Sequence, residues 1–174
     1  YPSDQLLCGL TEKTVQPCYV PLTQTQFLLL SYTPGTEASV RAIIAQAEKK
    51  LSPAEQICFD DDDPQSAVEF DRQIAALMPM LQQRKDADSD HPQWPWILIC
   101  VNNLRRCIDS IDDQTLRRLV SVICLGKRLG VALIAAGGAA DITKLSSAGE
   151  RLTMELIKQP TLCLLYTSDA ADEG

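Results

Sequence analysis

The run WPWILICVNN (residues 94–103) constrains the fold of this chain more than any other stretch. It is a continuous apolar segment that Pro95 opens and that two asparagines, Asn102 and Asn103, close. A run without polar alternation is typical of a central strand in a parallel sheet, because both faces of such a strand are buried. The sequence therefore predicts a parallel sheet whose polar carboxyl edge includes these two amides.

The rest of the chain shows the alternation of strands and helices that such a sheet requires. Strands are predicted near 17–22, 26–31, 55–59, 96–101, 130–136 and 161–165, and helices near 37–51, 65–84, 113–128 and 147–158. Pro79 should bend or break its helix in the last turn, and Asp112 or Asp113 should cap the helix that follows. The predicted class is α/β, with a mainly parallel sheet and helices on both faces.

Residues 26–44 read as a strand, a tight loop and an amphipathic helix, which is the setting of a phosphate-binding loop. The pattern G-x-x-x-x-G-K-[ST] is absent, and a glutamate stands near the place of its lysine. A carboxylate there should repel a triphosphate. We treat the segment as a vestigial nucleotide loop with these residues: Thr33, Pro34, Gly35, Thr36, Glu37, Ala38 and Ser39.

In P-loop NTPases the strand that corresponds to 96–101 ends in an aspartate that helps to hold Mg²⁺ and in an acid that orients water. Asn102 and Asn103 accept hydrogen bonds but carry no charge for either task. We therefore predict a vestigial Walker B pair, no catalytic residue and no cofactor. ATP with Mg²⁺ would bind only if backbone amides of the loop still hold phosphate.

Two further segments carry a family resemblance. GLTEKTVQPCYVPL (9–22) resembles the lead-in to FtsK/SpoIIIE-type ATPase domains, and GKRLGVALIAAGGAADITKL (126–145) resembles a late strand of that family. Ala136 and Gly137 stand where the family usually has a Thr-Gln pair. The resemblance covers about residues 6–165 and is greatest to the last, degenerate ATPase domain of type VII secretion coupling ATPases. It implies a RecA-like P-loop NTPase fold.

The resemblance also implies that the chain consists of a domain and a separate tail. We expect residues 1–162 to be one degenerate domain from a longer protein. The segment CLLYTSDAADEG (163–174) resembles the translation of a sequencing-library adapter, so we expect an artefactual tail there. The alternative is an ordinary polar tail after a final strand.

Charge and cysteine spacing limit the function classes. The net charge is −7, and the adjacent pairs Arg105–Arg106 and Arg117–Arg118 read as solvated helix surface, so no nucleic-acid partner is expected. The seven cysteines show no C-x-x-C pair, and the single histidine, His91, lies in a polar stretch, so we expect neither zinc nor cysteine catalysis. Three cysteines inside apolar runs read as small buried hydrophobes: Cys58, Cys100 and Cys124.

The acidic run Asp60–Asp63 suggests a Ca²⁺ or Mg²⁺ site, but neighbouring carboxylates cannot all reach one ion without a dedicated loop. We favour Asp63 as a helix N-cap and Pro64 as the first helical residue, with the other acids solvated. No metal site is predicted.

The resemblance implies a non-hydrolysing module of a type VII protein secretion motor, at the cytoplasmic face of the cell membrane. Its expected partners are a secreted WXG-type substrate protein or an adjacent ATPase domain, and the parent protein could form a hexamer. The alternative is an ATP-binding or ATP-hydrolysing FtsK/SpoIIIE-type translocase domain that acts on DNA or protein.

Trp94 and Trp96 are the predicted partner-binding residues, because tryptophan is enriched at binding hot spots. Alternation along a strand predicts that both indoles project to the same face, with at least one partly exposed beside an apolar groove. The alternative is that both simply cover the core.

Overall fold

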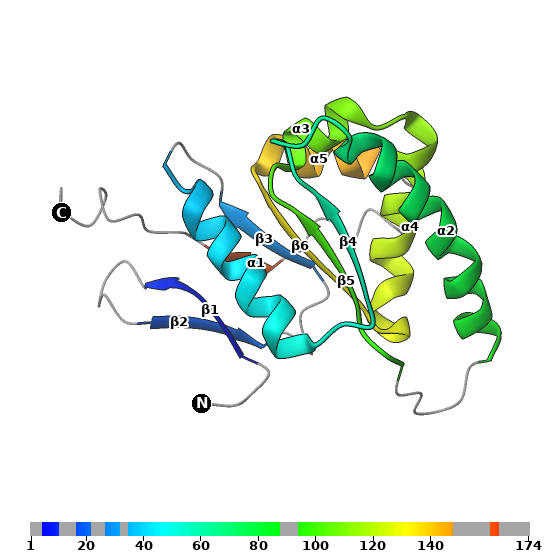
Figure 1. Ribbon diagram of the computed structural model, residues 1–174, viewed down its shortest axis with the longest axis horizontal. Helices are drawn as coiled ribbons and strands as arrows, with labels where there is room; N and C mark the ends of the chain where they lie inside the picture. The colour runs from blue at the N-terminus through cyan, green and yellow to red at the C-terminus, as the bar shows by residue number, and fades with distance from the viewer. Residues whose placement is uncertain are drawn as a thin grey trace.

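The computed structural model describes residues 5–10, 17–21, 27–31, 35–87, 94–147 and 161–163. Strands and helices alternate along most of the chain (Figure 1). The strands are β1 (Gln5–Leu10), β2 (Pro17–Pro21), β3 (Phe27–Ser31), β4 (Glu55–Phe59), β5 (Ile97–Val101), β6 (Val131–Gly137) and β7 (Thr161–Cys163). The helices are α1 (Glu37–Leu51), α2 (Ser66–Asp86), α3 (Leu104–Ser110), α4 (Asp113–Leu129) and α5 (Ala139–Ser147).

Five strands form the main sheet in the order β4-β5-β6-β3-β7, and every neighbouring pair is parallel. The apolar run that opened the sequence analysis is β5, and all five of its residues are buried. The parallel α/β sheet predicted from that run is therefore confirmed. β1 and β2 form a separate antiparallel pair, which the strand predictions only half anticipated.

Helices cover both faces of the main sheet (Figure 1). On one face α1 packs through Val40, Ile43 and Ala47 against the even-numbered residues of β5 and β6. On the other face α2 and α4 bury their apolar sides against the odd-numbered residues of the same strands. Period-two alternation in the strands thus divides the core into two layers. Among the described helices, none is both long and apolar enough to cross a membrane.

The helix boundaries differ from the predictions at informative places. α2 runs on past Pro79 to Asp86, so of the predicted bend or break, the break is wrong. α2 begins at Ser66, so the predicted start at Pro64 is also wrong; Asp63 instead accepts a hydrogen bond from the Gln65 N–H at 3.0 Å. Two short helices, α3 and α5, were not predicted, and the predicted helix at 147–158 falls almost wholly outside the described residues.

The ends of α4 follow the sequence signals. Asp112 is the N-cap, and its side chain accepts a hydrogen bond from the Thr115 N–H at 2.7 Å, as predicted. Gly130 follows the helix with a φ of 78°, in the left-handed region that favours glycine. A side chain at that position would also meet Trp94, whose Cβ would lie 3.0 Å from the added atom.

Candidate functional site

Polar residues gather at the carboxyl edge of the main sheet. β4, β5 and β6 are parallel neighbours that end at Phe59, Val101 and Gly137. The segments after them therefore emerge at the same edge, where ligands of open α/β sheets bind. The acidic turn Asp60–Asp62 and the asparagine pair come together here although they are about 40 residues apart in sequence.

Asn102 uses its whole amide on the acidic turn. Its Oδ1 accepts a hydrogen bond from the Asp61 N–H at 3.0 Å. Its Nδ2 donates to Asp60 Oδ1 at 3.2 Å and to Asp61 Oδ1 at 3.0 Å. An aspartate would lose both donors and would add a charge beside two carboxylates. The amide is therefore the side chain that this turn requires.

Asn103 has two tasks in the same network. It is the N-cap of α3, and its Oδ1 accepts from the Arg106 N–H at 3.1 Å. Its Nδ2 donates to Asp61 Oδ2 at 3.1 Å. The two asparagines thus hold both oxygens of Asp61 and connect β5, α3 and the turn after β4.

Arg41 reaches the same turn from the other side of the sheet edge, on α1. Its guanidinium makes a two-pronged contact with Asp60, at 2.9 and 3.1 Å, and a third contact with Asp62 at 2.8 Å. The hydrogen bond from Arg41 holds the pKa of the Asp60 carboxyl below its usual value, and that of Arg41 is raised. The expectation that these acids are simply solvated is wrong, because each has a partner.

A small cavity lies within this network. It has a volume of about 210 Å³ and is lined by Glu37, Arg41, Asp61, Asp62 and Asn102. Sites for drug-sized ligands span about 300–1,000 Å³. Three of its five lining side chains are carboxylates, and its one cation is already paired with Asp62. The cavity is therefore small and negatively charged, which disfavours an anionic ligand.

The predicted nucleotide loop is only partly described. Thr33 and Pro34 lie outside the described residues. Gly35 has a φ of 92°, which only glycine adopts readily, and Thr36 is buried at the start of α1. Glu37 lines the cavity beside the acidic turn. The remaining two residues of the prediction, Ala38 and Ser39, lie in the first turn of α1.

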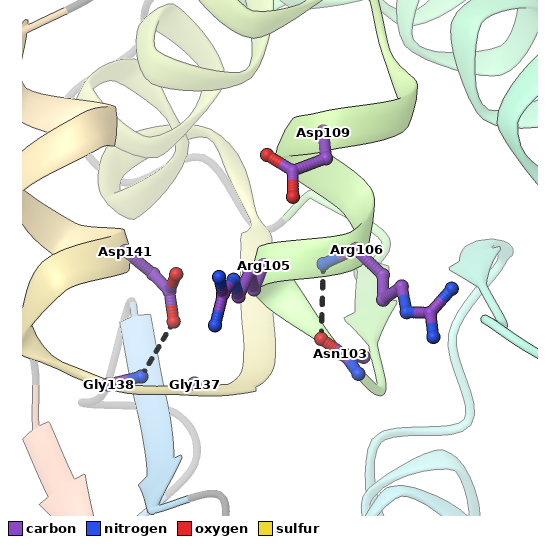
Figure 2. Close-up of a pocket in the computed structure, with 7 residues that line it drawn as sticks. All are labelled: Asn103, Arg105, Arg106, Asp109, Gly137, Gly138 and Asp141. Carbon is purple, nitrogen blue, oxygen red and sulfur yellow. Dashed lines mark hydrogen bonds between the residues drawn. The ribbon is translucent and has the colours of Figure 1, made fainter.

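A larger cavity lies next along the same edge, between α3 and the start of α5 (Figure 2). Its volume is about 570 Å³ and its lining residues are Asn103, Arg105, Arg106, Asp109, Gly137, Gly138 and Asp141. Figure 2 shows the hydrogen bond from the Gly138 N–H to Asp141 Oδ2, at 2.9 Å. Arginines and aspartates both line this cavity, so it suits a polar partner carrying either sign of charge.

Gly137, the last residue of β6, lines this cavity. A Cβ added there would lie 3.0 Å from Leu104 Cβ and 3.0 Å from Asp141 Oδ2. Close contact with α3 and α5 therefore explains the glycine at this position.

The two tryptophans lie at the other end of β5. Both are half-buried, which agrees with the predicted partial exposure, whereas the apolar groove beside them stays a prediction. The prediction of a common face is wrong. Trp96 packs against the α1-side core, whereas the Trp94 ring lies 5.3 Å from the Arg84 guanidinium of α2. Strand alternation does not extend to Trp94, because β5 begins only at Ile97.

Solved structures match this fold, although no protein-family model matches the chain and no curated protein matches it. EssC (ATPases 2 and 3) from Geobacillus thermodenitrificans superposes with a TM-score of 0.69 at 17% identity, covering 96% of this chain and 34% of that one. The cytoplasmic domain of the Thermomonospora curvata type VII secretion ATPase EccC gives 0.67 at 15% identity, covering 98% and 22%.

A third structure, Thermomonospora curvata EccC (ATPases 2 and 3) in complex with a signal sequence peptide, gives 0.63 at 15% identity, covering 98% and 35%. The fold is that of the EssC and EccC ATPase domains. This confirms the predicted FtsK/SpoIIIE-type ATPase fold. The chain spans between 22% and 35% of the length of these proteins.

Two residues of this edge, Arg41 and Asp141, were not singled out from the sequence. Arg41 lies on the exposed side of an amphipathic helix, where an arginine is ordinarily solvated. Asp141 lies in a segment with no predicted helix. Only the order of the strands could have placed either residue at the carboxyl edge.

Proposed function

We propose that this domain is a non-hydrolysing, ATPase-like module of a type VII protein secretion motor, which binds a substrate protein or an adjacent ATPase domain. In this proposal the fold is a RecA-like P-loop core, and residues 33–39 and the asparagine pair are its vestigial nucleotide loop and Walker B pair. The domain would act at the cytoplasmic face of the cell membrane as part of a longer protein.

The observation that carries the proposal is the network around Asn102. Phosphoryl transfer needs a carboxylate for Mg²⁺ and a cation on the terminal phosphates. At the end of β5 the amides of Asn102 and Asn103 are engaged with Asp60 and Asp61. The nearby cation, Arg41, is engaged with Asp60 and Asp62. These groups are therefore bound to one another. The cavity beside them is lined mainly by acids, whereas a nucleotide would need positive charge there.

Protein binding is supported by the comparison with EccC, whose ATPases 2 and 3 are known in complex with a signal sequence peptide. An equivalent partner for this domain is a helical secretion signal from a WXG-type protein. The half-buried indoles of Trp94 and Trp96 are our candidate anchors, because aromatic side chains supply contact area at low entropic cost.

Calorimetric titration separates the functions. We expect no heat of binding for ATP with Mg²⁺, and measurable binding of a WXG-type signal peptide. Tight nucleotide binding without turnover would favour the translocase alternative in a nucleotide-holding form, and the asparagine network would then be no obstacle to phosphate.

Two substitutions at Trp94 test the binding of the signal peptide. Trp94→Ala should weaken peptide binding by about tenfold, a loss of about 1.4 kcal/mol. Trp94→Phe keeps the ring beside Arg84 and should retain most of the affinity. Equal affinities for the wild type and both variants, with unchanged thermal unfolding, would remove Trp94 from the interface.

A further inference from the structure

Two cysteines from separate parts of the sequence lie side by side on neighbouring strands of the main sheet. Cys58 of β4 and Cys100 of β5 are register partners in a parallel pair. Neighbouring strands lie about 4.8 Å apart, so two aligned side chains on one face are in contact. Both thiols line a cavity of about 220 Å³ on the α1 side of the sheet.

Glu48 of α1 completes this cluster. Its carboxylate and the two sulfur atoms offer three ligand atoms that all lie within 4.8 Å of one another. In a tetrahedral zinc site with bonds of about 2.0–2.3 Å, ligand atoms are separated by roughly 3.5–3.8 Å. The three groups therefore need only small side-chain movements to share one ion.

The side chain of Gln56 shows that these three groups converge on one point. Its Nε2 donates to Glu48 Oε1 and to Cys58 Sγ at 3.3 Å, and it lies 4.0 Å from Cys100 Sγ. A single N–H₂ group thus stands among one carboxylate and two thiols. If the Gln56 amide rotated away, the same carboxylate oxygen and two sulfur atoms would surround a cation in its place.

Contrary to the expectation from cysteine spacing, we infer that Cys58, Cys100 and Glu48 form a binding site for a thiophilic divalent cation of the zinc class, with the fourth position open to the adjacent cavity. Thiolate and carboxylate are both ligands of Zn²⁺, and thiolates favour it over Mg²⁺ or Ca²⁺. Arg41 also lines this cavity, where its guanidinium is paired with Asp60 and Asp62. The site does not depend on the proposed secretion function.

A metal at this place would join three elements. Glu48 belongs to α1, Cys58 to β4 and Cys100 to β5, so one ion would tie the helix to the two strands beside the Arg41–Asp60 contact. A metal ion that binds the folded state but not the unfolded state stabilises the protein. We expect Zn²⁺ to raise the thermal unfolding midpoint.

The test is a Co²⁺ titration of the full chain, reduced with a phosphine that leaves no competing thiol. We expect one site with the ligand-field and charge-transfer absorption of tetrahedral thiolate coordination, and its displacement by Zn²⁺. Cys58→Ser and Cys100→Ser should each weaken Co²⁺ binding by at least about tenfold and should reduce the thiolate band. Cys58 is exposed, so its serine variant should keep the fold.

Three further variants sharpen the result. Glu48→Gln should weaken binding while the thiolate band remains, because only the oxygen ligand changes. Gln56→Ala should bind at least as tightly as the wild type, because it removes the competing donor. Cys124→Ser on α4 is the matched control and should bind unchanged.

The inference is overturned by any of three results. Absence of Co²⁺ binding to the reduced chain is one, and a disulfide between Cys58 and Cys100 as the sole reaction of this pair is the second. The third is a spectrum that survives unchanged in both serine variants, which would place the ion on other thiols.

Discussion

The side chain of Asn102 fits its place because an amide both donates and accepts hydrogen bonds. It accepts from one backbone N–H of the acidic turn and donates to two carboxylates of the same turn. An acid at this position would serve a metal ion, whereas the amide serves its protein neighbours. The choice between a carboxylate and an amide at this strand end thus decides whether the side chain serves a metal ion or its protein neighbours.

We expect Asn102→Asp to lower the free energy of unfolding by about 1–3 kcal/mol at neutral pH, because two donors are lost and carboxylates face each other. Urea unfolding measures the change. Asn103→Asp is the control: it keeps the cap on Arg106 N–H and loses one donor to Asp61, so its loss should be smaller. A more stable Asn102→Asp variant would contradict the role given to the amide.

The Arg41–Asp60 pair gives a prediction with a definite pH direction. The pKa of Asp60 is lowered in the folded state, so the pair contributes stability above the unfolded pKa of about 3.9 and loses it as the pH falls through the folded pKa. The pair is partly exposed, so its contribution at neutral pH should be at most about 1 kcal/mol.

Arg41→Ala should therefore be less stable than the wild type at pH 7, and the difference should fade in acid. Stability measured by urea unfolding across the acid range tests this. Arg41→Lys keeps the charge but loses the two-pronged contact, so its stability at pH 7 should lie between those of the wild type and Arg41→Ala. A difference that grows as the pH falls would refute the assignment.

At the scale of elements, α2 continues through Pro79 because tertiary packing outweighs the local cost. A proline inside a helix removes one backbone hydrogen bond and crowds the preceding turn. The buried residues on both sides of it, Leu77 and Leu81, hold the helix against the sheet. The expectation that proline breaks a helix applies to an isolated helix, whereas α2 is held by packing on both sides of Pro79.

Replacement of Pro79 by alanine should therefore stabilise the protein, by about 1–3 kcal/mol, because the missing N–H is restored and Pro79 is exposed. Chemical denaturation detects the gain as a higher midpoint with an unchanged slope. Gln83→Ala, on an exposed part of the same helix, should change stability little. No gain at Pro79 would indicate that α2 has adapted to the proline.

At the scale of the whole molecule, the parallel sheet brings strand ends from distant parts of the chain to one edge. The acidic turn, the asparagines and α1 meet there, and the cavity that they line, of about 210 Å³, is smaller than an ordinary ligand site. Charge supports the same conclusion, since acids outnumber the cation in the small cavity.

We expect no Mg²⁺-dependent ATP hydrolysis above background by the isolated domain. A coupled phosphate-release assay tests it, and turnover even near about 1 s⁻¹, within the ordinary range of enzymes, would contradict the proposal. Adding Lys at Ala38 and Asp at Asn102 together is a useful comparison. We expect that double variant to remain inactive, because the Asp60–Asp62 acids still fill the site.

Sequence alone determined the elements whose signals are local. An uninterrupted apolar run specified β5, a helical stripe specified α1 from Glu37 to Leu51, and Asp112 marked the start of α4. It missed β1 and the short helices α3 and α5, whose few residues carry little periodicity. These features depend on neighbours that local patterns do not reveal.

Tertiary structure decided which side chains meet. Asn102 and Asp61 are 41 residues apart, and Cys58 and Cys100 are paired across 42 residues, because parallel strands are joined by long crossovers. No spacing rule within one segment detects such pairs. Sequence therefore established the class of fold and placed two uncharged amides at the end of β5, and the strand order established which side chains those amides contact.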